Sequence, residues 1–267
     1  MRVNLGRLVG VTREYQIGMF RLTLPPNHQL PEWQKKFPLY DRFLPHLAGF
    51  LPPGSTVVDI GANVGDSIAG MAATNPGLNF LGVEADPQIF LLLERNSARI
   101  QNLISGRVRV VSEFIGEGAF YPNLKPGIDV PKRKTLSRLI FEQPLDGDSI
   151  SLIKSDTDGF DWDVLNSGSD YLQSKKPGLF FELQAWDQET RNRYEETLRW
   201  LFNIGYNHVA CFDNYGQLIS SEKGLTGVIG LMDYVLNQRT RTFYFVDVLM
   251  FREQDSTIFQ EALSSYH

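Results

Sequence analysis

The chain has 267 residues, 42% of them hydrophobic and 21% charged, with a formal net charge of −5 at pH 7. These proportions are those of a globular protein and exclude a largely disordered chain. The acidic balance argues against nonspecific nucleic-acid binding, which needs clustered Lys and Arg. The single cysteine, Cys211, can form no internal disulfide, and no stretch approaches the about 20 apolar residues of a membrane span. We therefore expect a soluble, cytoplasmic protein that binds neither nucleic acid nor membranes.

The N-terminal region is expected to form a cap on the rest of the chain. Residues 11–24 mix β-branched, aromatic and polar side chains, as a strand or hairpin does, and two prolines follow them. Apolar residues recur every three or four positions over 40–51, which predicts a helix with Pro45 in its first turn. The expected division is a cap (1–53), a main domain (54–254) and a C-terminal tail (255–267).

Strand and helix patterns alternate along the main domain. This alternation predicts an α/β, Rossmann-like fold whose mostly parallel, seven-stranded sheet carries helices on both faces. Ligands of such sheets bind beyond the carboxyl ends of the strands. Residues 113–135 have no clear periodicity and are typical of a functional loop. The expected strands are 56–60, 79–84, 107–112, 150–155, 179–183, 206–212 and 242–251, and the expected helices are 66–74, 87–99, 136–142, one that starts at 160–165, 189–202 and 228–237.

The most informative motif is an acid followed by a glycine-rich turn. A β-branched strand ends near Asp59, and the turn Gly61-Ala62-Asn63-Val64-Gly65 leads into a helix. Such a turn leaves backbone N–H groups free at the helix N-terminus, and its glycines let a ligand approach the main chain. Glu84 ends the next strand, roughly 20 residues after the turn, where an acid usually binds a ribose diol. We predict a nucleotide site here.

The position of Asp59 separates two cofactors. Nicotinamide sites use the pattern G-x-G-x-x-G, whose third glycine supports close packing of helix on strand. This chain instead has G-x-N-x-G with an acid two residues ahead of it. That acid can face an ammonium group, which S-adenosylmethionine carries and NAD does not. We therefore expect S-adenosylmethionine; the alternatives are another nucleotide or an ordinary strand–helix turn.

Together these motifs resemble the FkbM-type S-adenosylmethionine-dependent methyltransferases. The resemblance covers most of residues 40–252 and implies a class I methyltransferase fold. Two positions depart from the family pattern: Asp158 stands where the family usually has Glu, and Ser137 where it often has Asp. The shorter carboxylate puts a metal or acceptor role at Asp158 in doubt. The motifs that carry the resemblance are residues 57–65, 84–87, 154–159, 180–182 and 244–249.

The resemblance also implies a set of cofactor-binding residues. The loop 61–65 would hold the methionine carboxylate, Asp59 would face the amino group, and Glu84 would bind both ribose hydroxyls. The segment that follows the third strand would flank the adenine, with Glu113 accepting from its amino group and Phe114 stacking on it. The alternative is that Glu113 is solvated and Phe114 belongs to the core. The expected cofactor-binding set is Asp59, Gly61, Asn63, Gly65, Glu84, Ala85, Glu113 and Phe114.

Carboxylates follow the next two strands, beside the expected position of the methyl group. Asp156, Asp158 and Asp161 come after the strand at 150–155, and Glu182 ends the one after it. A hydroxyl acceptor has a high pKa, so a base that takes its proton would help the transfer. Carboxylate oxygens also suit Mg²⁺. The alternative is that these acids accept structural hydrogen bonds or start a helix. The expected catalytic residues, which are also the candidate metal ligands, are Asp156, Asp158 and Glu182.

The function implied by the resemblance is methylation of an oxygen on a sugar or another hydroxyl of a polysaccharide or natural product. The expected partner is thus a small-molecule or glycan acceptor. Two other classes stay open, a nicotinamide-dependent oxidoreductase and a noncatalytic nucleotide-binding module. The sequence leaves the metal dependence and the oligomeric state open, including a homo-oligomer.

Overall fold

The computed structural model describes residues 12–118, 132–143, 150–240 and 242–266. The strands predicted at 56–60, 79–84 and 150–155 are confirmed to the residue. The described strands are β1 (Arg13–Ile17), β2 (Phe20–Leu24), β3 (Thr56–Ile60), β4 (Asn79–Glu84), β5 (Val108–Ser112), β6 (Phe114–Ile115), β7 (Arg133–Lys134), β8 (Ile150–Ser155), β9 (Gly178–Leu183), β10 (His208–Asp213), β11 (Leu218–Lys223) and β12 (Val246–Phe251).

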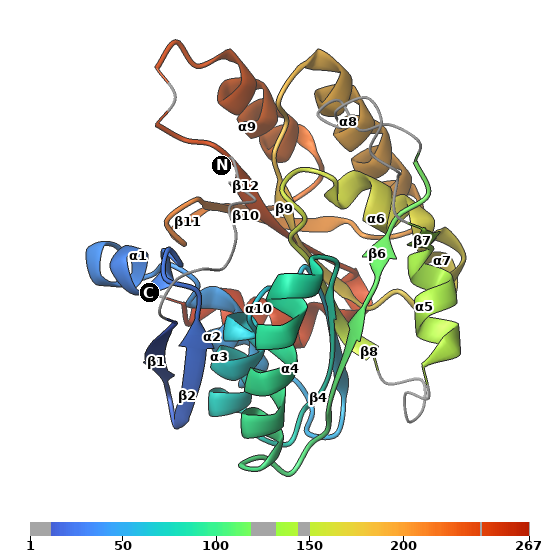
Figure 1. Ribbon diagram of the computed structural model, residues 1–267. Coiled ribbons are helices and arrows are strands. Elements are labelled where there is room, and N and C mark those ends of the chain that lie inside the picture. Colours follow the sequence, from blue (N-terminus) through green and yellow to red (C-terminus); the bar gives the residue numbers. More distant parts are fainter. Residues whose placement is uncertain (1–11, 119–131, 144–149, 241, 267) are drawn as a thin grey trace.

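Helices cover both faces of the central sheet (Figure 1). Within the described ranges, none is long and apolar enough to cross a bilayer. The described helices are α1 (Leu30–Lys36), α2 (Phe43–Ala48), α3 (Asp66–Thr74), α4 (Pro87–Gln101), α5 (Leu136–Glu142), α6 (Asp161–Ser167), α7 (Ser169–Lys175), α8 (Gln188–Asn203), α9 (Thr226–Asn237) and α10 (Ser256–Ser264), with a 3-10 turn at Glu253–Asp255.

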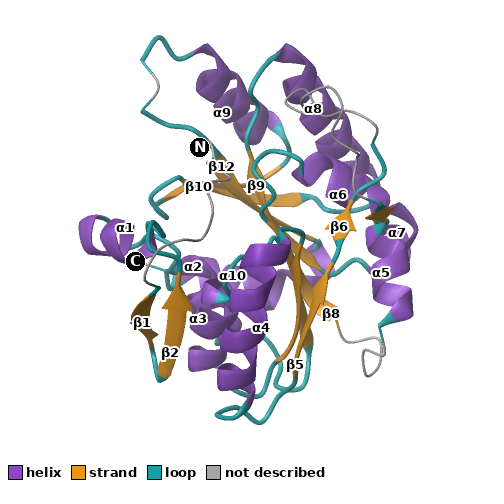
Figure 2. Ribbon diagram, in the orientation of Figure 1, coloured by secondary structure: helices purple, strands orange, loops and turns teal. Residues whose placement is uncertain are grey.

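The strand order of the central sheet is β11-β10-β12-β9-β8-β3-β4-β5. Figure 2 draws the strands in orange between the purple helices. Adjacent strands from β9 to β5 are parallel. Strand β12 runs antiparallel to both β9 and β10, and β11 runs antiparallel to β10. The α/β class and the mostly parallel sheet predicted from the sequence are thus confirmed. The carboxyl ends of β3, β4, β8 and β9 meet at one edge, where the ligand is expected.

The prediction of seven strands in this sheet is wrong, because β11 adds an eighth. This strand pairs with β10 through the turn that contains Gly216. Its sequence, Leu-Ile-Ser-Ser-Glu-Lys, is mostly polar, and none of its residues is buried. An edge strand of this kind lacks the β-branched, apolar run that identifies a buried strand. The apolar pattern therefore identifies β10 but does not identify β11.

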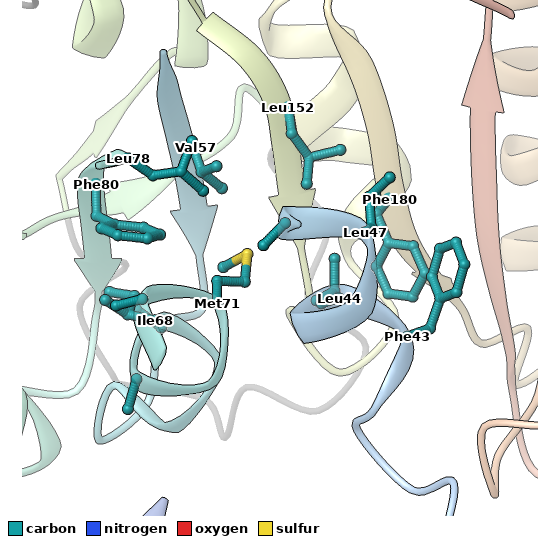
Figure 3. Close-up of a cluster of buried hydrophobic side chains, with 14 of the residues drawn as sticks. Phe43, Leu44, Leu47, Val57, Ile68, Met71, Leu78, Phe80, Leu152 and Phe180 are labelled. Carbon is teal, nitrogen blue, oxygen red and sulfur yellow. The ribbon is translucent and has the colours of Figure 1, made fainter. Parts of the chain in front are cut away.

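Two hydrophobic cores lie on opposite faces of the sheet because successive side chains of a strand alternate between its faces. Val57 joins the core formed with α2, α3, α4 and α10, whereas Val58 joins the core formed with α5 to α9. Figure 3 shows part of the first core, where Met71 of α3 and Leu47 of α2 lie near Leu152 of β8. The site described below lies at the edge of this first core.

A buried asparagine ties the N-terminal hairpin β1–β2 to the glycine-rich turn. The side-chain amide of Asn96, on α4, donates to the Thr23 carbonyl at 3.0 Å and to the Val64 carbonyl at 2.9 Å. Its oxygen accepts from the Thr23 N–H at 2.8 Å. Since Asn96 is fully buried, these bonds are costly to break. These hydrogen bonds hold the glycine-rich turn before α3 against α4 and the hairpin.

The helix predicted over 40–51 is shorter in the structure. Helix α2 covers only Phe43–Ala48, with Pro45 in its first turn as expected. Proline lacks an N–H and is tolerated only within the first turn, so the helix cannot extend far ahead of it. Asp41 instead has a φ of 54°, a left-handed conformation typical of a turn. This turn brings Tyr40 and Asp41 to the edge of the sheet.

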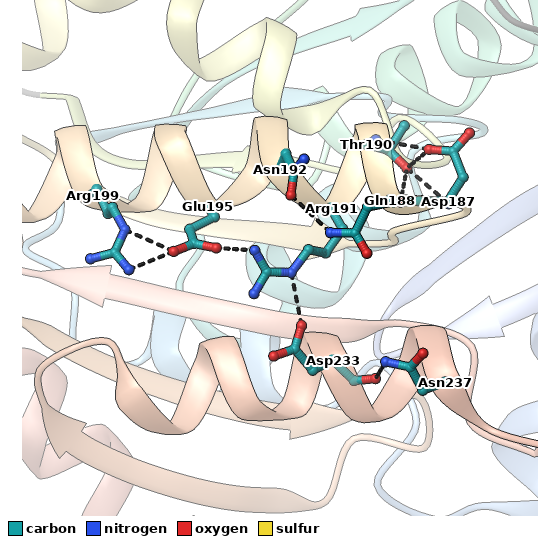
Figure 4. A network of polar contacts seen from close by, with 9 residues as sticks. All are labelled: Asp187, Gln188, Thr190, Arg191, Asn192, Glu195, Arg199, Asp233 and Asn237. Carbon is teal, nitrogen blue, oxygen red and sulfur yellow. Dashed lines mark hydrogen bonds and ion pairs between the residues drawn. The ribbon is translucent and has the colours of Figure 1, made fainter.

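Helices α8 and α9 are joined by a chain of ion pairs (Figure 4). Arg191 of α8 contacts Asp233 of α9 at 2.8 Å and also pairs with Glu195, which binds Arg199. Surface ion pairs contribute about 0–1 kcal/mol each, so this chain of pairs adds little to the stability of the fold. This layer lies on the face opposite the first core.

Candidate functional site

Polar side chains gather across the carboxyl edge of the sheet, on the face of the first core. Register places Asp59 of β3 beside Lys154 of β8, and Glu182 of β9 directly opposite Asp247 of β12. Asp156 follows Lys154 by two residues, just past the end of β8. The edge predicted from strand alternation therefore carries a continuous band of charged groups.

A buried ion pair lies beneath the glycine-rich turn. Asp59 is fully buried, and one of its oxygens lies 2.9 Å from the ammonium nitrogen of Lys154. Its other oxygen accepts from the Ser67 hydroxyl at 2.5 Å. The Lys154 ammonium also donates to the Gly61 carbonyl at 3.0 Å. Burial raises the pKa of Asp59, although Lys154 and Ser67 oppose that shift. In the structure Asp59 thus meets the chain's own ammonium, and its contact with a cofactor stays a prediction.

The glycine at the start of the turn is required by the chain itself. Gly61 has a φ of 74°, and a Cβ there would lie 1.9 Å from the backbone carbonyl oxygen of Asp156. The backbone just past β8 occupies the space that a Cβ would need, so the fold requires this glycine, and close approach of a ligand stays a prediction. The turn continues through Asn63, with a φ of 49°, and Gly65, with a φ of 86°.

The Gly61→Ala variant should be destabilised by more than left-handed strain alone. That strain costs about 1–2 kcal/mol, and the clash with the Asp156 carbonyl adds to it. Gly54→Ala is the matched control, since Gly54 has a φ of 86° and nothing within 4 Å of an added Cβ. Urea unfolding should show a clearly larger loss of free energy for Gly61→Ala. Equal losses of unfolding free energy in the two variants would mean that the Asp156 backbone moves away from residue 61 at little cost.

Helix α3 begins at this turn without a side-chain cap. Gly65 occupies its N-cap position, and no side chain accepts from the first-turn N–H groups. Helix α4, by contrast, is capped by Asp86, which accepts from Gln88 and Ile89. Uncapped N–H groups together with the helix dipole fit a carboxylate ligand. The predicted loop 61–65 therefore has donors suited to the methionine end of the cofactor.

Glu84 closes the other side of the turn. One carboxylate oxygen accepts from the Asn63 N–H at 2.9 Å, and the other accepts from the Asp86 N–H at 2.8 Å. Burial raises the pKa of Glu84, and these two hydrogen bonds oppose the shift. A carboxylate has about four lone-pair sites, so each oxygen can still accept from a ribose hydroxyl. Ala85 follows directly, between Glu84 and the capping residue.

The residues predicted to flank the adenine already contact basic side chains. Glu113 pairs with Lys134 at 2.6 Å, so it is not simply solvated. The guanidinium of Arg133 lies 5.4 Å from the centre of the Phe114 ring. Pairing of β6 with β7 brings these segments together. Asp163 reinforces the arrangement, because it accepts from the Gly118 N–H at 2.8 Å. Roles of Glu113 and Phe114 toward adenine stay predictions.

An acidic cavity lies beside the ion pair, at the carboxyl ends of β8 and β9. It brings together two of the predicted catalytic residues, Asp156 and Glu182. Asp158 does not line it and is exposed on the turn that follows β8. Asp161 is fully buried and accepts from the Ser155 hydroxyl, which fits the structural alternative. The lining residues are Tyr40, Asp41, Asp156, Glu182, Asn214, Gly216, Phe245 and Asp247.

Residues 59–207 match the family model described as the methyltransferase FkbM domain, which is more than half of the chain. The chain belongs to the FkbM methyltransferase domain family. As a member of this family, it is an S-adenosylmethionine-dependent methyltransferase rather than a nicotinamide enzyme. No curated protein matches the chain.

Solved structures with a similar fold are methyltransferases at low sequence identity. An S-adenosylmethionine-dependent methyltransferase from Agrobacterium tumefaciens is 12% identical, over 92% of this chain and 71% of that one, with a TM-score of 0.49. The FkbM methyltransferase from Methylobacillus flagellatus KT is 16% identical, over 74% of this chain and 43% of that one, with a TM-score of 0.47. Precorrin-6y C5,15-methyltransferase from Geobacter metallireducens GS-15 is 12% identical, over 78% of this chain and 86% of that one, with a TM-score of 0.43.

The three candidate magnesium ligands of this FkbM-family chain do not come together as one metal-binding group. Across residues 12–118, 132–143, 150–240 and 242–266, no three His, Cys, Asp or Glu side chains are arranged to hold a metal ion. Asp156, Asp158 and Glu182 are candidate ligands because each lies at or just after the end of one of two adjacent strands. Asp158 has a φ of 53° in the turn, and the tight backbone of Gly159 packs against Trp186 there. Its carboxylate is therefore outside the cavity that the other two line.

Sequence reasoning missed the residues that complete the cavity. Asp41 and Asn214 lie on turns whose position depends on tertiary packing, so no local pattern identifies them. Asp247 did leave a signal, since it is the one acid inside the apolar strand β12. A charged residue in a strand that is otherwise buried is a sign of function, and it could have been singled out.

Proposed function

We propose that this FkbM-family enzyme transfers the methyl group of S-adenosylmethionine to a hydroxyl oxygen of a small-molecule or glycan acceptor bound in the acidic cavity. One observation carries the proposal. The cavity that Asp156 and Glu182 line adjoins the turn at 61–65, because the Asp156 carbonyl packs directly on Gly61. Donors suited to the cofactor and carboxylates suited to the acceptor thus lie side by side.

The residues of the turn fit the cofactor. Uncapped N–H groups of α3 suit its carboxylate, and Glu84, held by two backbone N–H groups, suits its ribose. We keep Glu113 and Phe114 as the adenine contacts and Asp59 as the acid nearest the amino group. Lys154 would then hold both Asp59 and the turn in place.

S-adenosylmethionine, when bound, supplies a methyl group on a positively charged sulfur. The acceptor oxygen forms a bond to the methyl carbon while the carbon–sulfur bond breaks and its electron pair goes to sulfur. The hydroxyl proton would go to the deprotonated carboxylate of Glu182, whose burial raises its affinity for a proton. Asp156 would orient the hydroxyl. Alignment of the two reactants provides much of the remaining rate enhancement.

Calorimetry with S-adenosylhomocysteine and NAD tests the cofactor assignment. We expect S-adenosylhomocysteine to bind and NAD to bind poorly, because the chain has an acid beside the turn and lacks G-x-G-x-x-G. Methyl transfer from a labelled donor, with the product analysed by NMR, then distinguishes an O-methyl from an N-methyl group. Tight NAD binding without heat from S-adenosylhomocysteine would refute the assignment.

The Glu84→Ala variant should bind S-adenosylhomocysteine at least about tenfold more weakly. Hydrogen bonds to a charged group are worth about 1.5–3 kcal/mol, and a tenfold change corresponds to about 1.4 kcal/mol. Glu94→Ala is the matched control, because Glu94 is exposed on α4. Circular dichroism and the melting temperature confirm that each variant folds. An unchanged dissociation constant in folded Glu84→Ala would show that Glu84 does not bind the ribose.

A further inference from the structure

The cavity is more acidic than proton transfer requires. Four of its eight lining residues are carboxylates, and none is Lys, Arg or His. They come from four separate segments: Asp41 from the turn before α2, Asp156 from the end of β8, Glu182 from β9 and Asp247 from β12. One base is enough for methyl transfer to oxygen, so the remaining acids need another explanation.

Two buried acceptors in the cavity lack donors. Among the described residues, Oε1 of Glu182 and Oδ1 of Asn214 have no hydrogen-bond partner. Glu182 is 9% exposed and Asn214 is 4% exposed, so both atoms are shielded from bulk water. Buried acceptors without a donor are costly, and native proteins satisfy nearly all of them. Both atoms therefore point to a ligand that donates hydrogen bonds.

The acids also repel one another. Glu182 lies directly opposite Asp247 in the β9–β12 pair, and like charges in that position are destabilising. Burial and the neighbouring carboxylates raise the pKa of both groups. Asp41, which also lines the cavity, is exposed. Lys154 lies 3.6 Å from Asp156, but its ammonium is paired more closely with Asp59 at 2.9 Å. In the absence of a cation, the raised pKa values favour the protonated, neutral forms of these acids, and a bound cation would favour their charged forms.

An ammonium group fits this wall better than a neutral hydroxyl or a metal ion. It offers three donors, no acceptor and a positive charge, whereas a hydroxyl would bring lone pairs against the carboxylates. No metal-binding group is formed among the described residues. Tyr40, which also lines the cavity, stacks on Trp33 at 5.7 Å.

We propose that the acceptor is an amino alcohol or amino sugar whose ammonium group binds to Asp41 and Asp247, while its hydroxyl faces Glu182 and Asp156. This inference rests on the function proposed above and narrows the acceptor to a cationic class. Asp41 and Asp247 are then specificity-determining residues and take no part in proton transfer. Asn214 accepts an additional hydrogen bond from the same ligand.

The test compares matched pairs of ligands on the enzyme saturated with S-adenosylhomocysteine. Glucosamine, galactosamine and 2-aminocyclohexanol are titrated by calorimetry beside glucose, galactose and cyclohexanol. We expect the amines to bind at least about tenfold more tightly, since charge-assisted hydrogen bonds are the strong ones. Equal binding of the neutral parents, or no binding by any amine, would overturn the proposal.

Two variants assign the effect to the cavity wall. Asp41→Asn and Asp247→Asn should each lose about tenfold of the preference for amines while S-adenosylhomocysteine binds as before. Both should fold, because Asn tolerates the left-handed φ of Asp41 and relieves the repulsion at Asp247. Asp170→Asn, at an exposed position of α7, is the control with full preference.

The outcomes separate this inference from the proposed function. A preference retained in both variants would overturn the cationic site but leave methyl transfer standing. Heat from MgCl₂ alone that is lost in Asp41→Asn would assign the acids to a metal ion and would also overturn it. Failure of the wild-type enzyme to bind S-adenosylhomocysteine would instead contradict the proposed function.

Discussion

Replacing Lys154 by Met is expected to lower the free energy of unfolding by about 3–5 kcal/mol. The change removes the ammonium that lies 2.9 Å from the fully buried carboxylate of Asp59. Breaking a buried pair by removing one partner is costly because the other charge stays behind without compensation. The hydrogen bond to the Gly61 carbonyl is lost at the same time.

Urea unfolding at constant m-value measures this effect. Lys35→Met, at an exposed position of α1, is the matched control and should change stability by no more than about 0.5 kcal/mol. The double variant Asp59→Asn with Lys154→Met should recover part of the loss, because it leaves no unpaired buried charge. A Lys154→Met protein as stable as the Lys35→Met control would show that the pair contributes nothing.

The sequence predicted the parallel half of the sheet well because its signals there are local. Apolar, β-branched runs such as Val57-Val58 identify buried strands, and Asp86-Pro87 marks the start of α4, where Asp86 does cap the helix. The edge strand β11 escaped prediction because half-exposed strands carry polar residues. The predicted helix over 40–51 was too long because the spacing of apolar residues does not show that a turn at Asp41 precedes α2.

The residues of the candidate site also fall into two groups, those that local sequence signals identify and those that they do not. Glu84, Asp156 and Glu182 were identified because they lie at or just beyond strand ends, and parallel strands end at one edge. Asp41 and Asn214 reach that edge only through packing of distant turns, which no local pattern describes. The reason for Gly61 could not be predicted either, since it depends on the approach of the Asp156 carbonyl from another strand.

The Glu182→Gln variant is expected to lower kcat by about 10²–10⁴, the usual contribution of a general base. It keeps the shape of the side chain and removes the proton acceptor. S-adenosylhomocysteine should bind as before, because Glu182 lies on the acceptor side of the turn. Glu196→Gln, an exposed position on α8, is the matched control and should keep full activity. Turnover is followed as release of S-adenosylhomocysteine with an acceptor selected in the binding experiments.

The pH profile shows whether Glu182 acts as the base. Burial, with the charges of Asp156 and Asp247, raises its pKa well above the ordinary value of about 4.3. Because the base must be deprotonated, kcat/KM should fall as the pH drops through this raised pKa, at a higher pH than for an exposed glutamate. Asp156→Asn removes a neighbouring negative charge, so it should lower that pKa and move the acid limb to lower pH. Full activity in Glu182→Gln, or an acid limb that Asp156→Asn leaves in place, would assign the proton transfer to another group and leave alignment as the main source of rate.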